Sequence, residues 1–171
     1  MLVVEKPLLS PGLVTSERAL RVLEFLEACG GAPEEALLLL DPHRPDRTRK
    51  SLASLRAGGW AYRARLDGEM LWLPRGADPP RTELEFRRQS VIGWLAARLA
   101  EAGGAYAAGA AVFSNRQAFP ALVVPPDRPG RGSVLAVLLD CASPDGLPAG
   151  SLWVRAEDLR VERLERCLRR A

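Results

Sequence analysis

The chain has 171 residues and an ordinary globular composition, with 47% hydrophobic and 26% charged residues and a formal net charge of +3. No apolar run approaches the roughly 20 residues that cross a bilayer, and residues 1–12 lack a signal-peptide pattern. Three widely spaced cysteines and one histidine argue against a disulfide framework and against a Cys/His zinc site. We therefore expect a cytoplasmic protein without membrane association. The excess of arginine over lysine, 22 to 2, suggests a GC-rich genome.

Two helices are predicted before residue 42. The first begins at a cap formed by Thr15 or Ser16 and ends at the glycine pair 30–31. Between these limits apolar residues recur at helical spacing: Ala19, Val22, Leu23 and Leu26. The second helix is shorter; it begins near Pro33, a residue that is tolerated in a first helical turn, and ends before Asp41.

A third helix is predicted from a cap at Asp46 to the glycine pair 58–59, and its faces differ in chemistry. At about 100° per residue, one face collects the apolar positions and one threonine: Thr48, Leu52 and Leu55. The opposite side and the two flanks are polar or basic: Lys50, Ser54, Arg47, Ser51, Arg49 and Arg56. We expect the first face to pack and the basic side chains to remain in solvent.

Residues 60–73 show the pattern of a β-hairpin. Residues 60–66 and 69–73 alternate as strands, and the intervening Asp67-Gly68 is favoured in two-residue hairpin turns. Positive charge is concentrated in this part of the chain. Residues 43–65 hold seven basic side chains and one acid, a net charge of +6, whereas the rest of the chain sums to −3. A basic helix followed by a basic β-ribbon is typical of DNA-binding proteins.

Residues 46–73, D-R-T-R-K-S-L-A-S-L-R-A-G-G-W-A-Y-R-A-R-L-D-G-E-M-L-W-L, resemble the recognition helix and wing of bacterial winged helix-turn-helix proteins. The resemblance implies such a domain over residues 13–75, with helix 47–57 in the major groove and hairpin 60–73 on the DNA backbone. From the hairpin, Arg63 or Arg65 would reach phosphate or the minor groove. The side chains assigned to DNA contact are Arg44, Arg47, Arg49, Lys50, Ser54, Arg56, Arg63 and Arg65.

A run of proline, glycine and charge at residues 75–81 precedes a second predicted domain, residues 82–171. It begins with a capping box formed by Thr82 and Glu85. The helix that follows ends at the glycine pair 103–104, and its apolar stripe includes Leu84, Val91, Leu95 and Leu99.

Strands are predicted at residues 107–113, 121–124, 133–140 and 152–154, before a final helix at 156–170. Residues 134–139 are all apolar, so we expect the third strand to be buried on both faces. The predicted fold class is α+β, with a winged helix-turn-helix followed by a small α/β domain of helix, three to four strands and helix.

Residues 81–95, with the later F-P-A-L-V-V and L-A-V-L-L-D, resemble the replication-relaxation family of conjugative plasmids and transposons. That resemblance implies a degenerate restriction-endonuclease-like fold after the winged helix. A nuclease of this kind needs two or three carboxylates on adjacent strands and a lysine. Asp140 is the one candidate carboxylate, and the lysines are Lys6 and Lys50 alone. Since other catalytic motifs are also missing, we predict no enzymatic activity, catalytic residue, metal site or cofactor.

Two functional hypotheses follow. The first is a non-enzymatic double-stranded DNA-binding protein, a regulator or an accessory factor of replication or mobilisation, whose second domain forms a homodimer or recruits a protein partner. The alternative is a protein-interaction module of a conjugation or replication assembly that uses the winged helix for partner or self-association. The charge cluster motivates the first hypothesis. The apolar second half and the modest net charge of +3 motivate the alternative.

Overall fold

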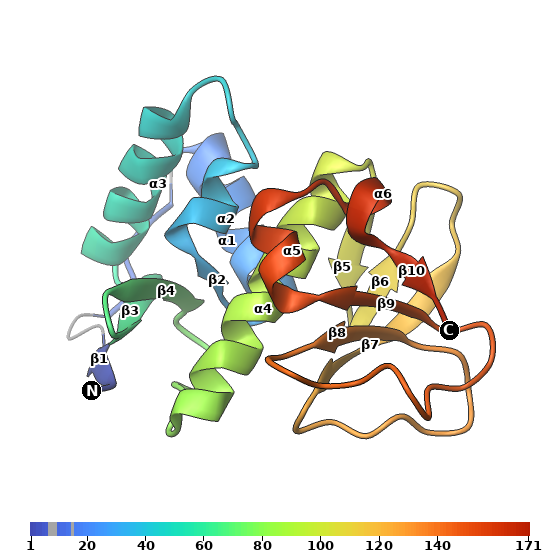
Figure 1. Ribbon diagram of the computed structural model, residues 1–171. Helices are drawn as coiled ribbons and strands as arrows, with labels where there is room; N and C mark the ends of the chain where they lie inside the picture. Colours follow the sequence, from blue (N-terminus) through green and yellow to red (C-terminus); the bar gives the residue numbers. More distant parts are fainter. Residues whose placement is uncertain (7–9, 15) are drawn as a thin grey trace. The chain divides into compact units, whose positions relative to one another are not determined.

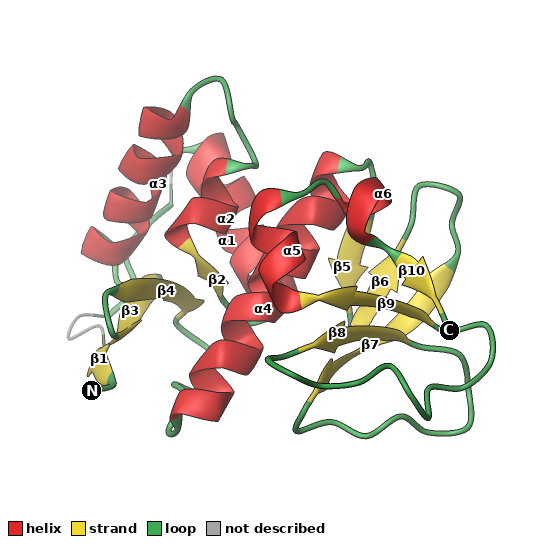
Figure 2. Ribbon diagram, viewed as in Figure 1, coloured by secondary structure: helices red, strands yellow, loops and turns green. Residues whose placement is uncertain are grey.

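The computed structural model describes residues 1–6, 10–14 and 16–171, and it combines helices with two β-sheets (Figure 1). The α+β class predicted from the sequence is confirmed. The described chain forms two compact units, Met1–Gly93 and Trp94–Ala171, each with one sheet (Figure 2). Helix α4 (Glu83–Glu101) runs through the boundary. Residues 82–93, which the sequence assigned to the second domain, therefore lie in the first unit.

The first unit contains a four-stranded antiparallel sheet in the order β1-β3-β4-β2. Its strands are β1 (Val3–Glu5), β2 (Ala32–Pro33), β3 (Ala61–Leu66) and β4 (Glu69–Pro74). Its helices before α4 are α1 (Glu17–Cys29), α2 (Glu34–Leu38) and α3 (Pro45–Ala57). The order α1-β2-α2-α3-β3-β4 thus interleaves three helices with three strands, and β1 adds a fourth strand beside β3.

Helix α1 begins and ends where its local signals predict. The Ser16 side chain accepts a hydrogen bond from the Ala19 amide at 3.3 Å, and Gly30 provides the left-handed cap at φ 76°. Thr15, the other predicted cap, lies outside the described residues. Helix α2 begins one residue later than predicted, because Pro33 belongs to β2 and is paired with Leu71.

The predicted cap of α3 is wrong by two residues. Arg44 occupies the cap position and Pro45 the first helical position, where a missing N–H costs no hydrogen bond. Asp46 therefore lies in the first turn, where its carboxylate complements the positive end of the helix dipole. The predicted packing face is confirmed, since Thr48, Leu52 and Leu55 are each at most 1% exposed.

The hairpin of β3 and β4 has the predicted two-residue turn. Asp67 and Gly68 both have positive φ, 48° and 91°, as this turn type requires. The inner face of the hairpin builds a core cluster from both strands and α4: Tyr62, Ala64, Leu66, Leu71, Leu73 and Phe86. Because Leu84 is 40% exposed, the apolar stripe predicted for α4 is wrong at that position, and Phe86 packs instead.

The second unit contains a six-stranded sheet in the order β10-β9-β8-β7-β6-β5. The pairs β7–β8 and β8–β9 are parallel, and the other pairs are antiparallel. The strands are β5 (Ala105–Ala107), β6 (Ala110–Val112), β7 (Ala118–Val124), β8 (Leu135–Leu138), β9 (Leu152–Arg155) and β10 (Arg169–Arg170). All four residues of β8 are buried, as their apolar run predicts.

Two predictions for this unit are wrong. The segment at 107–113 was expected to be one strand, but a turn at Ala108 and Gly109, both with positive φ, divides it between β5 and β6. The helix expected at 156–170 is divided into α5 (Ala156–Val161) and α6 (Leu164–Cys167). Glu162 separates them with an extended backbone, and the last residues pair with β9 as β10.

Candidate nucleic-acid interface

Helix α3 presents a row of polar and basic side chains on the surface opposite its packed face. Three of the predicted contact residues, Arg47, Lys50 and Ser54, are exposed there, and a fourth, Arg44, is exposed at the N-cap of the helix. The burial of Leu52 and Leu55 fixes the rotation of the helix and so the orientation of Arg47, Lys50 and Ser54, whereas Arg44 is the N-cap residue and has a non-helical backbone. None of the three cations in this group forms an ion pair with a described residue. We call Arg44, Arg47, Lys50 and Ser54 the open face of α3.

Arg49 is bound on the flank of α3. Its guanidinium contacts Glu34 of α2, with Nε at 3.2 Å from Oε1, and Asp46 of its own helix, with Nη1 at 3.3 Å from Oδ1. The other oxygen of Glu34 accepts a hydrogen bond from the Trp72 indole at 3.3 Å. Arg49 therefore joins α3 to α2 and, through Glu34, to strand β4. About half of its side chain, 51%, remains exposed.

Arg56 and Arg63 converge on one carboxylate oxygen, Oε2 of Glu5. Arg56 Nη2 lies 2.9 Å from it, and Arg63 donates from Nε at 3.1 Å and from Nη2 at 2.6 Å. The Arg63 guanidinium carbon also lies 5.6 Å from the centroid of the Trp72 ring. The Arg63 side chain is only 19% exposed. Of the two hairpin arginines predicted to reach DNA, Arg63 is thus held by a carboxylate within the protein, and its contact with DNA stays a prediction.

The strand register explains how these residues meet. Glu5 is directly opposite Arg63, and Arg63 is directly opposite Trp72, so the three side chains form one row across β1, β3 and β4. Contacts at the ends of the row extend it to both halves of α3. The complete sequence of contacts is Arg56, Glu5, Arg63, Trp72, Glu34 and Arg49. We call these six residues the polar row.

Arg65 occupies the neighbouring position of β3 on the same face and differs from Arg63. It is opposite Val3 and Met70, neither of which carries a charge. Its side chain is exposed, and no carboxylate of the described chain pairs with it. Arg65 is therefore the hairpin cation that remains open to a ligand.

Ion pairing changes the acidity of Glu5. The hydrogen bond from Arg63 and the positive charges of Arg63, Arg56 and Arg65 lower the pKa of this carboxyl below its ordinary value of 4.5, and its partial desolvation opposes them. Glu5 is consequently ionised at neutral pH. This role of Glu5 is hard to predict from the sequence, because β1 has only three residues and its partner strand lies some 60 residues away.

Two hollows lie in the first unit outside the polar row. One, of about 430 Å³, is lined by α1 and the segment leading into α3: Arg18, Arg21, Val22, Phe25, Leu40, Asp41 and Thr48. Arg18 and Arg21 line this hollow together with Thr48 of the packed face of α3, and they are not among the predicted contact residues. Arg21 is paired with Glu17, whereas no ion pair joins Arg18 to a described residue.

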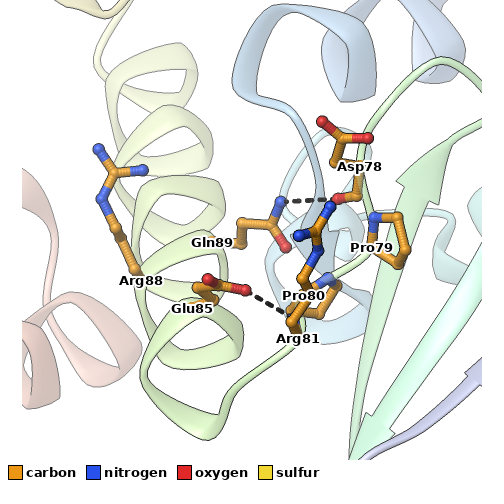
Figure 3. A pocket seen from close by; sticks show the side chains of 7 residues that line it. All are labelled: Asp78, Pro79, Pro80, Arg81, Glu85, Arg88 and Gln89. Carbon is orange, nitrogen blue, oxygen red and sulfur yellow. Dashed lines mark hydrogen bonds between the residues drawn. The ribbon is translucent and has the colours of Figure 1, made fainter.

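The second hollow, of about 260 Å³, lies at the start of α4 (Figure 3). Its walls carry charges of both signs, from Asp78 and Glu85 and from Arg81 and Arg88. Gln89 donates to the Asp78 carbonyl at 3.4 Å, and its own Oε1 is buried without a hydrogen-bond partner. The hollow differs from the open face in carrying acidic as well as basic side chains. None of the residues that line the hollow is among the predicted DNA contacts.

The described residues contain no group of three or more His, Cys, Asp and Glu side chains arranged to hold a metal ion. Asp140, the carboxylate considered for a nuclease site, is exposed just beyond β8. Cys29 is buried, which raises the pKa of its thiol to about 11 and keeps it protonated at neutral pH. In the same described ranges, no helix has the length and apolar character needed to cross a membrane.

Comparisons with protein-family models, with curated proteins and with solved structures found no match.

Proposed function

We propose that the first unit is a winged helix-turn-helix module that binds double-stranded DNA without catalysis, with α3 as its recognition helix. The observation that carries the proposal is the open face of α3: Arg47 and Lys50 lie opposite a fully packed face, Arg44 lies at the N-cap, and none of the three pairs with a carboxylate of the described residues. The element order α1-β2-α2-α3-β3-β4, with β2 paired to β4, supports the assignment of the module.

The open face supplies the groups that read DNA in the major groove. Arginine and lysine donate to the paired acceptors of guanine, and a serine hydroxyl can contact several bases. Arg65 on the hairpin provides a separate cation for a phosphate. Arg49, Arg56 and Arg63 have a different role in this proposal: they hold α3 and the hairpin together through the polar row.

The biological role that we propose is a cytoplasmic regulator or an accessory factor of replication or mobilisation. In this role the second unit forms a homodimer or recruits a protein partner. Strand β5 supports that part of the proposal, because it is the last strand of its sheet and pairs with β6 alone among the described strands. Such an edge exposes backbone groups that can pair with another chain.

Fluorescence anisotropy with a labelled duplex tests DNA binding. Counterion release predicts that log K falls with log salt by about 0.9 for each phosphate contacted, so three to four free cations predict a slope of about −3. The double variant Arg47→Glu with Lys50→Glu should weaken binding by on the order of 100-fold, because two attractive charges become repulsive. A slope near zero, or unchanged binding by the double variant, would refute the proposal.

The matched control is Glu24→Arg with Glu27→Arg on α1, where both glutamates are exposed. This variant changes charge by the same magnitude in the opposite direction and leaves α3 intact. If general charge alone governed binding, it should tighten binding about as much as the first variant weakens it. We expect a much smaller gain, because the contacts come from α3.

A further inference from the structure

Glu5 is the acid that lies among the cations of helix α3 and the hairpin. We propose that Glu5 confines DNA contact to the open face of α3 and Arg65, by neutralising Arg56 and Arg63 and by repelling phosphate from the base of the hairpin. This inference rests on the proposed DNA-binding function. It assigns a selectivity role to a residue on a strand that the winged-helix resemblance does not include.

The position of Glu5 is set by backbone pairing. Residues 3–5 of β1 pair with residues 63–65 of β3, which places the Glu5 side chain beside Arg63. A contact at the other end of the hairpin reinforces this pairing, since the Met1 amino group lies 3.0 Å from an Asp67 carboxylate oxygen. The carboxylate is therefore a fixed part of the surface.

One oxygen of Glu5 accepts three hydrogen bonds from two guanidinium groups. The Glu5 side chain is 36% exposed and that of Arg56 is 47% exposed, so this cluster faces solvent where a phosphate could approach. A phosphate there would meet two cations and one anion at close range. At the open face it meets cations without a neighbouring acid, apart from Asp46 in the first turn of α3.

A phosphate is therefore expected to bind more favourably at the open face than beside Glu5. A carboxylate a few ångströms from a phosphate opposes binding with an energy that corresponds to about a fivefold change in affinity in a water-like dielectric. The lowered pKa of Glu5 keeps this repulsion in place over the whole neutral range. Arg65, two residues along β3 from Arg63, has an uncharged partner on β1 and forms no ion pair with a described residue.

The test is the variant Glu5→Gln, which removes the charge and retains an amide oxygen that can accept from both guanidinium groups. We expect about fivefold tighter binding to a labelled duplex near 100 mM salt. The salt slope should also steepen by about 0.9 to 1.8, as one or two further phosphates become bound. A merely structural role for Glu5 would change thermal stability without steepening this slope.

Two further variants make the result decisive. Glu24→Gln on the exposed surface of α1 makes the same change in net charge away from the hairpin, and we expect its slope to equal that of the wild type. Adding Arg63→Gln and Arg56→Gln to Glu5→Gln should return the slope to the wild-type value, because the released cations are then gone.

The outcomes separate the two proposals. If the wild type binds with a steep salt slope but Glu5→Gln behaves like Glu24→Gln, or binds more weakly than the wild type, the role of Glu5 is refuted and DNA binding stands. If the wild type shows no salt-dependent binding, the proposed function itself fails. Circular dichroism and thermal melting of each variant confirm that a loss of binding does not arise from unfolding.

Discussion

The open face and the flank of helix α3 both carry basic side chains, but only those on the flank form ion pairs with other described residues of the protein. On the open face, Arg44, Arg47 and Lys50 have no ion-pair partner among the described residues. On the flank, Arg49 and Arg56 are bound to carboxylates from α2 and β1. A cluster of cations in a sequence is therefore not a cluster of free charges. Two of the acids that decide the difference, Glu34 and Glu5, lie outside residues 43–65, and the third, Asp46, lies within them.

The largest expected effect is on the free energy of unfolding, and it concerns the packed face of α3. Leu52→Ala should lower the free energy of unfolding by about 2–5 kcal/mol, because it leaves a cavity at a position with 0% exposure. Ser54→Ala, two residues away on the open face, should change it by less than about 0.5 kcal/mol. Urea denaturation measures both values. Similar stabilities for the two variants would mean that α3 is rotated differently, and the distinction between its sides would be lost.

Smaller effects are expected for the two hairpin arginines: one substitution should mainly lower stability, and the other should mainly change the salt dependence of DNA binding. Arg63→Ala should cost about 1 kcal/mol of stability, since it breaks a partly buried ion pair, and it should leave the salt slope of DNA binding unchanged. Arg65→Ala should cost less than about 0.5 kcal/mol and reduce the magnitude of the slope by about 0.9. Denaturation and anisotropy on the same preparations test both. The reverse pattern would exchange the roles that we assign to these residues.

The smallest effect is the pH dependence of the polar row. The pKa of Glu5 is lowered in the folded protein, so its stabilising contribution is complete above the ordinary value of 4.5 and is lost as pH falls through the folded-state pKa. The stability difference between the wild type and Glu5→Gln should thus be constant from neutral pH to about pH 5 and shrink below it. Thermal melts across this range measure it. A difference that grows on acidification would contradict the ion pairing.

Local signals account for the features that could be predicted from the sequence. Helix α1 has a serine cap and a terminal glycine, α3 has a 3.6-residue apolar period, and the hairpin has Asp67-Gly68 at its turn. Each of these signals lies within a few residues of the feature that it specifies. The same periodicity predicted that Arg47, Lys50 and Ser54 lie away from the packed face of α3.

Pairing between distant segments explains what was missed. Three residues of β1 carry too short a pattern to indicate a strand, yet their pairing with β3 brings Glu5 to Arg63. The contact of Glu34 with Arg49 likewise depends on the packing of α2 against α3. The predicted C-terminal helix does not reach residue 170 because residues 169–170 pair with β9, a tertiary contact that overrides local helix propensity.

The place of Trp72 in the polar row offers an optical measurement of these contacts. Its indole is 5% exposed, donates to Glu34 and faces the Arg63 guanidinium. Breaking either contact changes the charge beside the ring and the water around it, so the emission of this tryptophan should report the state of the row without an attached dye. The difference spectrum between the protein and its Trp72→Phe variant isolates that emission from the other three tryptophans.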